Sequence, residues 1–306
     1  MLTLASFPIF MKQFLFGILF FSAAITFTQT DEREIIKETK IISSVSTLYS
    51  YTVEGDRHEG GAKLDYKKYD SEGNVIHLIK YNVGKQGINY QWFYKYDKNH
   101  NIIEGTKKDA NDVIIEKYNA KYNNENKKTE QIGVVNSNPY SLTFTYQNGL
   151  LTSKYRIVNS DTVFHYKYHY NEQNLLMTED YTTSDLAIKT VYSYNEKQLC
   201  SKQQTFLDDE IKKVIEFKYD DKNRKTEERT YNQEEKLVST YTYQYNTSGY
   251  ISSLVNYDHQ LGYEKNKWKY EYDGNGLNTK IYTYDSGDKY PVYVKEFLFK
   301  FPKKKN

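Results

Sequence analysis

The chain has 306 residues with 42 Lys and Arg against 40 Asp and Glu, so a formal charge of +2 gives no strong field to attract nucleic acid. The single cysteine, Cys200, excludes a disulfide framework and a thiolate metal cluster. The mean hydropathy of −0.83 argues against membrane-spanning helices in the body of the chain, and 33 tyrosines favour half-buried strands.

Residues 1–28 have the pattern of a secretory signal peptide. Met11-Lys12 supplies the positive charge, residues 14–21 (FLFGILFF) form the apolar stretch, and small residues lead to a cleavage site near Thr28. An uncleaved membrane anchor is the weaker alternative, because the apolar run is short for a span. The mature chain is therefore expected to lack a membrane span. We expect it in the periplasm of a Gram-negative bacterium, or secreted to its surface.

Residues 29–65 are predicted to form an N-terminal cap, with a strand near 45–53. Residues 66–291 then contain nine copies of an aromatic-then-polar pair, separated by about 24–27 residues. Such a period is typical of a stacked supersecondary unit. The nine anchor tyrosines are Tyr69, Tyr96, Tyr122, Tyr146, Tyr170, Tyr194, Tyr219, Tyr245 and Tyr272.

Each copy is predicted to be a β-hairpin. Aromatic residues alternate with polar ones before the anchor, as in 164–170 (FHYKYHY), and this period of two indicates a strand with one aromatic face. Turn-forming residues follow, as in 70–73 (DSEG), and then a second strand such as 75–81.

The expected fold is all-β, with antiparallel hairpins forming a long, twisted or coiled sheet, either a β-solenoid or a meander. Residues 292–306 are predicted to be a closing strand followed by a basic tail. Charged flanks at both ends of the sheet would blunt its exposed edges.

The segment Tyr69-Asp70-Ser71-Glu72-Gly73-Asn74-Val75 resembles the YD repeat of Rhs-type proteins, a Tyr-Asp-x-x-Gly-x-aliphatic pattern. Residues 246–251 and 273–277 resemble it less closely, and other copies keep the aromatic residue but lose the glycine. The resemblance covers roughly residues 60–300 and implies a secreted bacterial array of β-hairpins. In large Rhs proteins such hairpins form a shell around a toxin, but this chain has no Asp-Pro-containing core motif and no C-terminal cargo domain.

No catalytic residue, metal ligand or cofactor site is predicted. His165 and His169 are about 13 Å apart on one strand face, too far to share a metal. Cys200 has no neighbouring base that would make it reactive. Trp92 and Trp268 each precede an anchor tyrosine by four residues. They are predicted to fill the core, and they are weak candidates for an aromatic platform that binds a ligand.

The leading functional prediction is a non-enzymatic, exported repeat scaffold or binding protein. Its partner would be a glycan, cell-wall material or a protein, and not nucleic acid. The first alternative is an outer-membrane β-barrel, which shares even-numbered strands and alternating faces. A Lys/Glu-rich face and tyrosines at mid-strand argue against lipid contact. Less favoured alternatives are an enzyme with a site in a groove of the sheet, or a fragment of a delivery or immunity system.

Overall fold

The fold is that of a computed structural model, which describes residues 32–83 and 87–302. The predicted signal peptide (1–28) and the last residues of the basic tail (303–306) lie outside the described residues. The division into cap, repeat domain and closing segment stays a prediction.

The described residues form one helix and twenty strands, which confirms the prediction of an all-β protein. The elements are α2 (Glu32–Thr39), β1 (Ser43–Ser50), β2 (Ala62–Tyr69), β3 (Val75–Tyr81), β4 (Ile88–Tyr96), β5 (Ile102–Asp109), β6 (Ile114–Tyr122), β7 (Lys128–Val135), β8 (Asn138–Gln147), β9 (Leu150–Val158), β10 (Asp161–Tyr170), β11 (Leu176–Thr182), β12 (Ala187–Tyr194), β13 (Cys200–Leu207), β14 (Glu210–Tyr219), β15 (Lys225–Asn232), β16 (Leu237–Tyr245), β17 (Ile251–Asp258), β18 (Tyr263–Tyr272), β19 (Asn278–Asp285) and β20 (Tyr293–Lys300).

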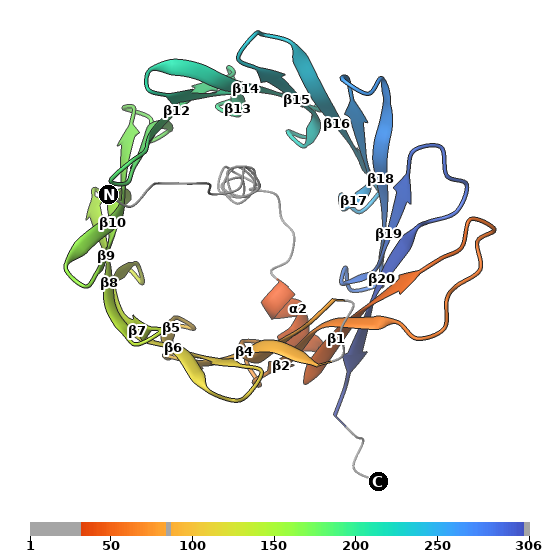
Figure 1. Cartoon of the computed structure of the whole chain (residues 1–306), viewed down its shortest axis with the longest axis horizontal. Coiled ribbons are helices and arrows are strands. Elements are labelled where there is room, and N and C mark those ends of the chain that lie inside the picture. The colour runs from red at the N-terminus through yellow and green to blue at the C-terminus, as the bar shows by residue number, and fades with distance from the viewer. Residues whose placement is uncertain (1–31, 84–86, 303–306) are drawn as a thin grey trace, which may run out of the picture.

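The sheet closes on itself. Each strand pairs antiparallel with its neighbours in sequence, and β1 also pairs with β20 over eight residue pairs, from Ser43 opposite Lys300 to Ser50 opposite Tyr293. Figure 1 shows the resulting ring of strands. The prediction of a long open sheet with blunted edges was therefore wrong. The twisted hairpins curl until the first and last strands meet, and a continuous ladder of hydrogen bonds replaces both edges.

The aromatic face of the hairpins lines the inside of the barrel. Residues that lie directly opposite each other on neighbouring strands point to the same face of the sheet. Asp65 lies opposite Lys80, and Lys80 lies opposite Tyr90, so these residues share one face. Following the pairs around the ring places Lys295 on that face as well. Tyr69 belongs to this face and packs against α2. Because α2 lies within the ring in Figure 1, this is the inner face.

Every anchor tyrosine follows a break in strand register, at the residue before the turn. In eight of the nine copies the anchor is followed by Asp or Asn, and Gln147 follows Tyr146. In one example the Asp97 carboxylate accepts hydrogen bonds from the backbone N–H groups of Asn99 (2.8 Å) and Asn101 (3.0 Å). In eight of the nine turns, the fourth residue after the anchor has positive φ, which Gly and Asn adopt most easily. These residues are Gly73, His100, Asn126, Asn174, Gln198, Asn223, Gly249 and Gly276.

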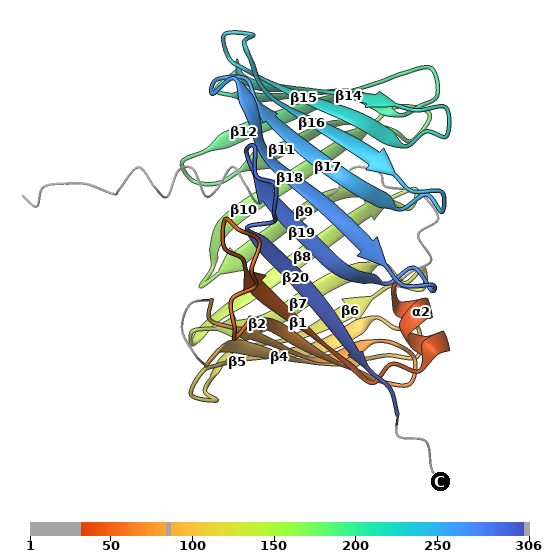
Figure 2. The same ribbon diagram turned by 90° about the vertical axis from the view of Figure 1, so that its right-hand side faces the viewer.

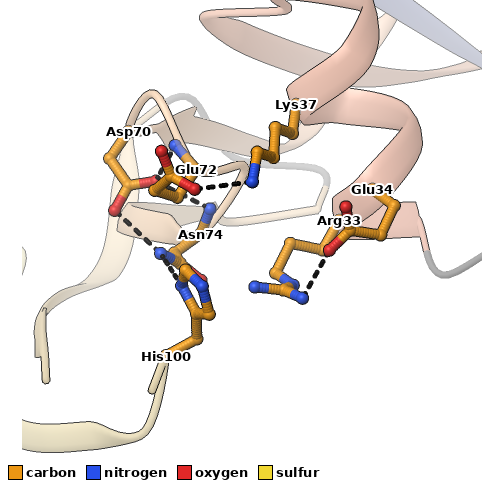
Figure 3. A network of polar contacts seen from close by, with 7 residues as sticks. All are labelled: Arg33, Glu34, Lys37, Asp70, Glu72, Asn74 and His100. Carbon is orange, nitrogen blue, oxygen red and sulfur yellow. Dashed lines mark hydrogen bonds and ion pairs between the residues drawn. The ribbon is translucent and has the colours of Figure 1, made fainter. Parts of the chain in front are cut away.

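Helix α2 closes off part of the end of the barrel where these turns lie (Figure 2). Ile35 and Ile36 are buried against Tyr69 and Leu277. The Lys37 ammonium lies 2.7 Å from the Glu72 carboxylate (Figure 3) and, by hydrogen bond and charge, lowers the pKa of that carboxyl. Apolar burial and an ion pair thus hold the helix on the turn that follows β2.

Candidate functional site: the inner face of the barrel

The anchor tyrosines form a repeated hydrogen-bond pattern at the turn end of the inner face. Each of eight anchor hydroxyls donates to the backbone carbonyl of the residue that faces the preceding anchor, at distances of 2.7–3.0 Å. Tyr96 donates to Val75 opposite Tyr69, and Tyr122 donates to Ile102 opposite Tyr96. The first anchor, Tyr69, instead pairs with the Ser44 hydroxyl at 2.9 Å. Each of the other eight hydroxyls thus pairs with a carbonyl beside the preceding register break.

Trp92, a candidate platform residue, lies on the inner face and is half-buried. Its ring stacks on Tyr94, with centroids 5.5 Å apart, and meets Tyr118 edge-on at 5.9 Å. Tyr118 faces Gly105 on one side and Gly133 on the other. A Cβ on Gly105 would lie 2.3 Å from the Tyr118 ring, so the two glycines make the space that the ring fills.

Trp268, the other candidate, also lies on the inner face, opposite Leu254 and Thr283, and is half-buried. Strands β19, β20, β1, β2 and β3 lie between β18 and β4, so the structure does not bring Trp268 and Trp92 together. That either tryptophan binds a ligand stays a prediction.

Four cationic side chains lie over aromatic rings on the part of the inner face formed by β4 to β10. We call this set the cation–aromatic wall: Lys107 is 4.3 Å from the Tyr90 centroid, Lys128 5.8 Å from Tyr122, Lys154 4.4 Å from Tyr166, and Arg156 4.5 Å from Tyr140. Such cation–π contacts hold the cations against the wall at modest energetic gain.

These four cations form no ion pair with any residue that the structure describes. Glu116 lies directly opposite Lys107 in the register and accepts a hydrogen bond from the Tyr140 hydroxyl at 2.9 Å. Glu179, which faces Tyr168 on the same wall, interacts electrostatically with Lys154. Asp109 lies two residues from Lys107 on the same strand face, and Asp161 faces Val158, two residues from Arg156. The Arg156 Nε is buried without a hydrogen-bond partner in the described part of the chain. Acids thus lie near the four cations on the inner face without forming ion pairs with them.

On the outer face, by contrast, cations pair with acids across the strands. Three of these pairs occupy equivalent positions, one residue before an anchor and nine residues later: Lys95–Glu104 at 3.2 Å, Lys121–Glu130 at 2.6 Å and Lys218–Glu227 at 2.9 Å. His169 pairs with Asp180 at 3.3 Å on the same face. The outer surface is thus polar and internally charge-balanced at this end of the barrel.

The sequence alone did not identify the cation–aromatic wall. The alternation of aromatic and polar residues predicts the inward face only for the first strand of each hairpin, and there the lysines fall on the outer face. Lys128, Lys154 and Arg156 lie on second strands, and a register break changes which residues face inward there. Lys107 lies on a second strand too, and counting two residues at a time from Tyr96 across the turn places it on the wrong face.

Other reactive groups are not gathered into a site. Cys200 is buried, with its thiol 3.6 Å from the Lys202 carbonyl. Within residues 32–83 and 87–302, no cluster of His, Cys, Asp and Glu is arranged to hold a metal ion. The same residues contain no helix long and apolar enough to cross a membrane.

Comparison with protein families and with curated proteins finds no match. Among solved structures, this chain is similar to a TcdB2-TccC3-TEV structure (11% identity, TM-score 0.40, covering 81% of this chain and 16% of that one). It is also similar to porin-like proteins from Bacteroides uniformis (10%, TM-score 0.38, covering 85% and 98%) and Bacteroides vulgatus (9%, TM-score 0.32, covering 70% and 94%). These values are low. No function follows from them.

Closure itself distinguishes the two leading functional predictions. A closed antiparallel barrel with an even number of strands is the architecture of outer-membrane barrels. It therefore supports the outer-membrane alternative better than the open repeat scaffold, and it agrees with the coarser prediction of an exported protein.

Proposed function

We propose that this chain is an exported β-barrel of the Gram-negative cell envelope and that it acts through its inner wall. The observation that carries this proposal is closure of the sheet with its aromatic and cationic face inside. Porins of 16–18 strands leave an aqueous channel, and this barrel has twenty. Tyr94, Tyr168 and Tyr270 on the inner wall keep intermediate solvent exposure, which indicates that water reaches the wall.

The first candidate location, or placement, of the barrel is the outer membrane, and the closed sheet supports it. A second candidate, a barrel standing in the aqueous periplasm or at the cell surface, is favoured by the outer face. Spanning barrels carry an outward apolar band about 25 Å tall, and a lysine or arginine at its middle costs about 2–4 kcal/mol. Lys95–Glu104, Lys121–Glu130 and Lys218–Glu227 instead put paired charges on the outer wall near its turn end, beside exposed apolar side chains such as Ile132.

Kinship with Rhs-type repeats is a further part of this proposal. It is supported by the Tyr-Asp turn at Tyr69 and by the equivalent position of every anchor beside a register break. In this interpretation the repeat builds a barrel wall instead of a shell around a toxin.

Fractionation of a Gram-negative host that expresses the whole chain tests the proposal. The membrane pellet is washed with alkaline carbonate and then extracted with detergent, while mass spectrometry of the mature protein locates its N-terminus. Export with cleavage near residue 29 is expected. Retention in carbonate-washed outer membrane would establish the first placement, and recovery in the detergent-free periplasm or medium would establish the second. Uncleaved protein in the cytoplasm would contradict the proposal itself.

A further inference from the structure

We infer that one side of the outer wall binds a lipid surface that carries anionic headgroups. The inference rests on the second placement of the proposed function, because it attaches to a membrane a barrel that otherwise stands in water. We call this side the seam face, because it spans the contact between β20 and β1 that closes the barrel. Its side chains lie on the outer face of β20, β1, β2 and β3: Val45, Tyr66, Lys68, Ile79, Leu298 and Lys300.

A row of apolar side chains crosses the seam face. Leu298 lies opposite Val45, which in turn lies opposite Tyr66. Tyr66 lies opposite Ile79 on the next strand. Leu298 is 64% exposed, more than any other large apolar side chain on a described strand, and Phe301, directly after β20, is 54% exposed. Covering such side chains removes apolar surface from water, which favours contact with an apolar partner.

Cations without acidic partners lie beside this row, toward the turns. Lys300 lies opposite Ser43, and Ser43 lies opposite Lys68. Both lysines are exposed, and neither forms an ion pair with a residue that the structure describes. In the sequence, three more lysines follow at 303–305. This end of the seam face is therefore positively charged.

Glu296 is the acid that the described residues place on the outer face of these four strands. Its carboxylate lies 3.4 Å from the Arg57 guanidinium and 3.6 Å from the Lys280 ammonium. It also lies nearer the loop end of β20 than Lys300 does. Two other cations thus already balance this acid, and it does not neutralise Lys68 or Lys300.

Acids in the adjoining turn after β2 are engaged as well. The Asp70 carboxylate accepts hydrogen bonds from backbone N–H groups of its own turn, and Glu72 pairs with Lys37. Elsewhere on the outer wall, lysines such as Lys121 pair with glutamates such as Glu130 across the strands. The seam face differs from those parts of the wall, because it combines exposed apolar side chains with net positive charge.

An anionic lipid surface matches both properties. Apolar side chains enter the boundary between headgroups and acyl chains, and lysines near the surface are attracted to anionic headgroups. A barrel that spans the membrane needs an apolar band on every side, whereas paired charges interrupt the outer wall away from the seam face. We therefore expect the barrel to lie on the lipid surface by one side and not to cross it.

Co-sedimentation of the purified mature chain with vesicles tests the inference. The chain is kept in detergent-free buffer, and vesicles of phosphatidylcholine alone are compared with vesicles that also contain phosphatidylglycerol. We expect binding to the phosphatidylglycerol vesicles and little binding to the others. Raised salt should weaken the binding, because it screens the attraction between exposed lysines and headgroups. An alkaline carbonate wash should release the bound chain, since the barrel does not span the bilayer.

The apolar row is tested with Leu298→Asn, which removes its most exposed side chain. The matched control is Ile132→Asn, which changes an aliphatic side chain that is 48% exposed on the outer face of β7. The seam-face variant is expected to weaken vesicle binding at least about fivefold, and the control is expected to leave it unchanged. Circular dichroism establishes that both variants keep the barrel.

The charge is tested with Lys68→Gln/Lys300→Gln, which removes both cations and keeps most of each side-chain stem. Its matched control is Lys167→Gln/Lys189→Gln, which removes two exposed lysines from the outer face of β10 and β12. Loss of two lysines near the headgroups is expected to weaken binding at least about fivefold, whereas the control should bind as the wild type does.

Several results would overturn the inference: no binding to vesicles, equal binding to both kinds of vesicle, equal losses in a variant and its control, or a bound chain that withstands the carbonate wash. A dimer in vesicle-free solution that Leu298→Asn dissociates would show that a second copy covers the seam face instead. None of these results contradicts the proposed function, which fails only if the chain is not exported.

Discussion

The Tyr170 hydroxyl donates a 2.9 Å hydrogen bond to the backbone carbonyl of Leu151, the residue that faces the preceding anchor, Tyr146. The strand register breaks beside Leu151, between Thr145 and Tyr146, and such a break disrupts the local ladder of hydrogen bonds. The next repeat supplies a donor at this point. This explains why the anchor is tyrosine and not phenylalanine, since the ring alone would fill the same space.

Replacing Tyr170 with Phe is expected to lower the free energy of unfolding by about 1 kcal/mol, because the Leu151 carbonyl loses its donor. Denaturant titration of the purified barrel measures the effect. Tyr168→Phe is the control, since Tyr168 lies on the same strand and face and its hydroxyl has no hydrogen-bond partner in the described residues. Equal effects of the two variants would show that the anchor hydroxyl has no special role.

Replacing Gly133 with Ala is expected to destabilise the barrel by about 1–3 kcal/mol, as overpacking does. The added Cβ would lie 2.4 Å from the Lys117 carbonyl oxygen and 2.8 Å from the Tyr118 Cβ, and neither can move without shifting β6. Gly274→Ala is the control, because a Cβ there meets nothing within 4 Å and its φ is not positive. Thermal unfolding compares the two, and an unchanged melting temperature for Gly133→Ala would contradict the packing described for Tyr118.

Replacing Asp97 with Asn is expected to make stability less dependent on pH. Partial burial acts to raise the pKa of Asp97, but hydrogen bonds from Asn101 and Asn99 outweigh it, so the pKa lies below its ordinary value of 3.8. A depressed pKa contributes stability above the unfolded value, and this contribution is lost as pH falls through the folded value.

The wild-type chain should therefore lose more stability than Asp97→Asn when the pH drops below about 4. Unfolding midpoints measured between neutral and acidic pH test this. Asn is a fair substitute, because Asn123 accepts the same two backbone bonds at the equivalent turn. Parallel pH curves for the two proteins would show that the Asp97 carboxylate is not stabilised by its turn.

Replacing Ile36 with Ala is expected to loosen α2 without opening the barrel. Ile36 is 1% exposed, and truncating a buried isoleucine costs about 2–5 kcal/mol. Hydrogen exchange should accelerate at the α2 amides while the strand amides keep their protection. Glu38→Ala, at an exposed position of the same helix, is the control. Unfolding of the whole barrel by the Ile36 substitution would show that α2 is part of its global core.

The local parts of the fold could be predicted from the sequence because each depends on a few neighbouring residues. Alternation before Tyr170 marks a strand, and Asp97 or Asn171 followed by a residue tolerant of positive φ marks the turn. Copies that lack the turn glycine looked degenerate, yet Asn126 and Gly73 occupy the same left-handed conformation. The backbone requirement is shared even where the residue differs.

Closure and the cation–aromatic wall could not be predicted in the same way. Pairing of Ser43 with Lys300 joins residues at opposite ends of the chain, and no local pattern records it. The inward position of Lys154 depends on the register shift between Thr145 and Tyr146. A single-residue shift of this kind reverses the face of each residue that follows.

The ladder between β1 and β20 also sets the width of the molecule. In an open array, copies of the hairpin can be gained or lost at either end with little effect on the rest. Here each hairpin is a fixed fraction of a circumference, and barrel diameter grows roughly in proportion to strand number. Loss of one hairpin would force every remaining strand to a tighter curvature. The number of repeats thus sets the inner diameter of the barrel, and with it the size of any molecule that the barrel can hold.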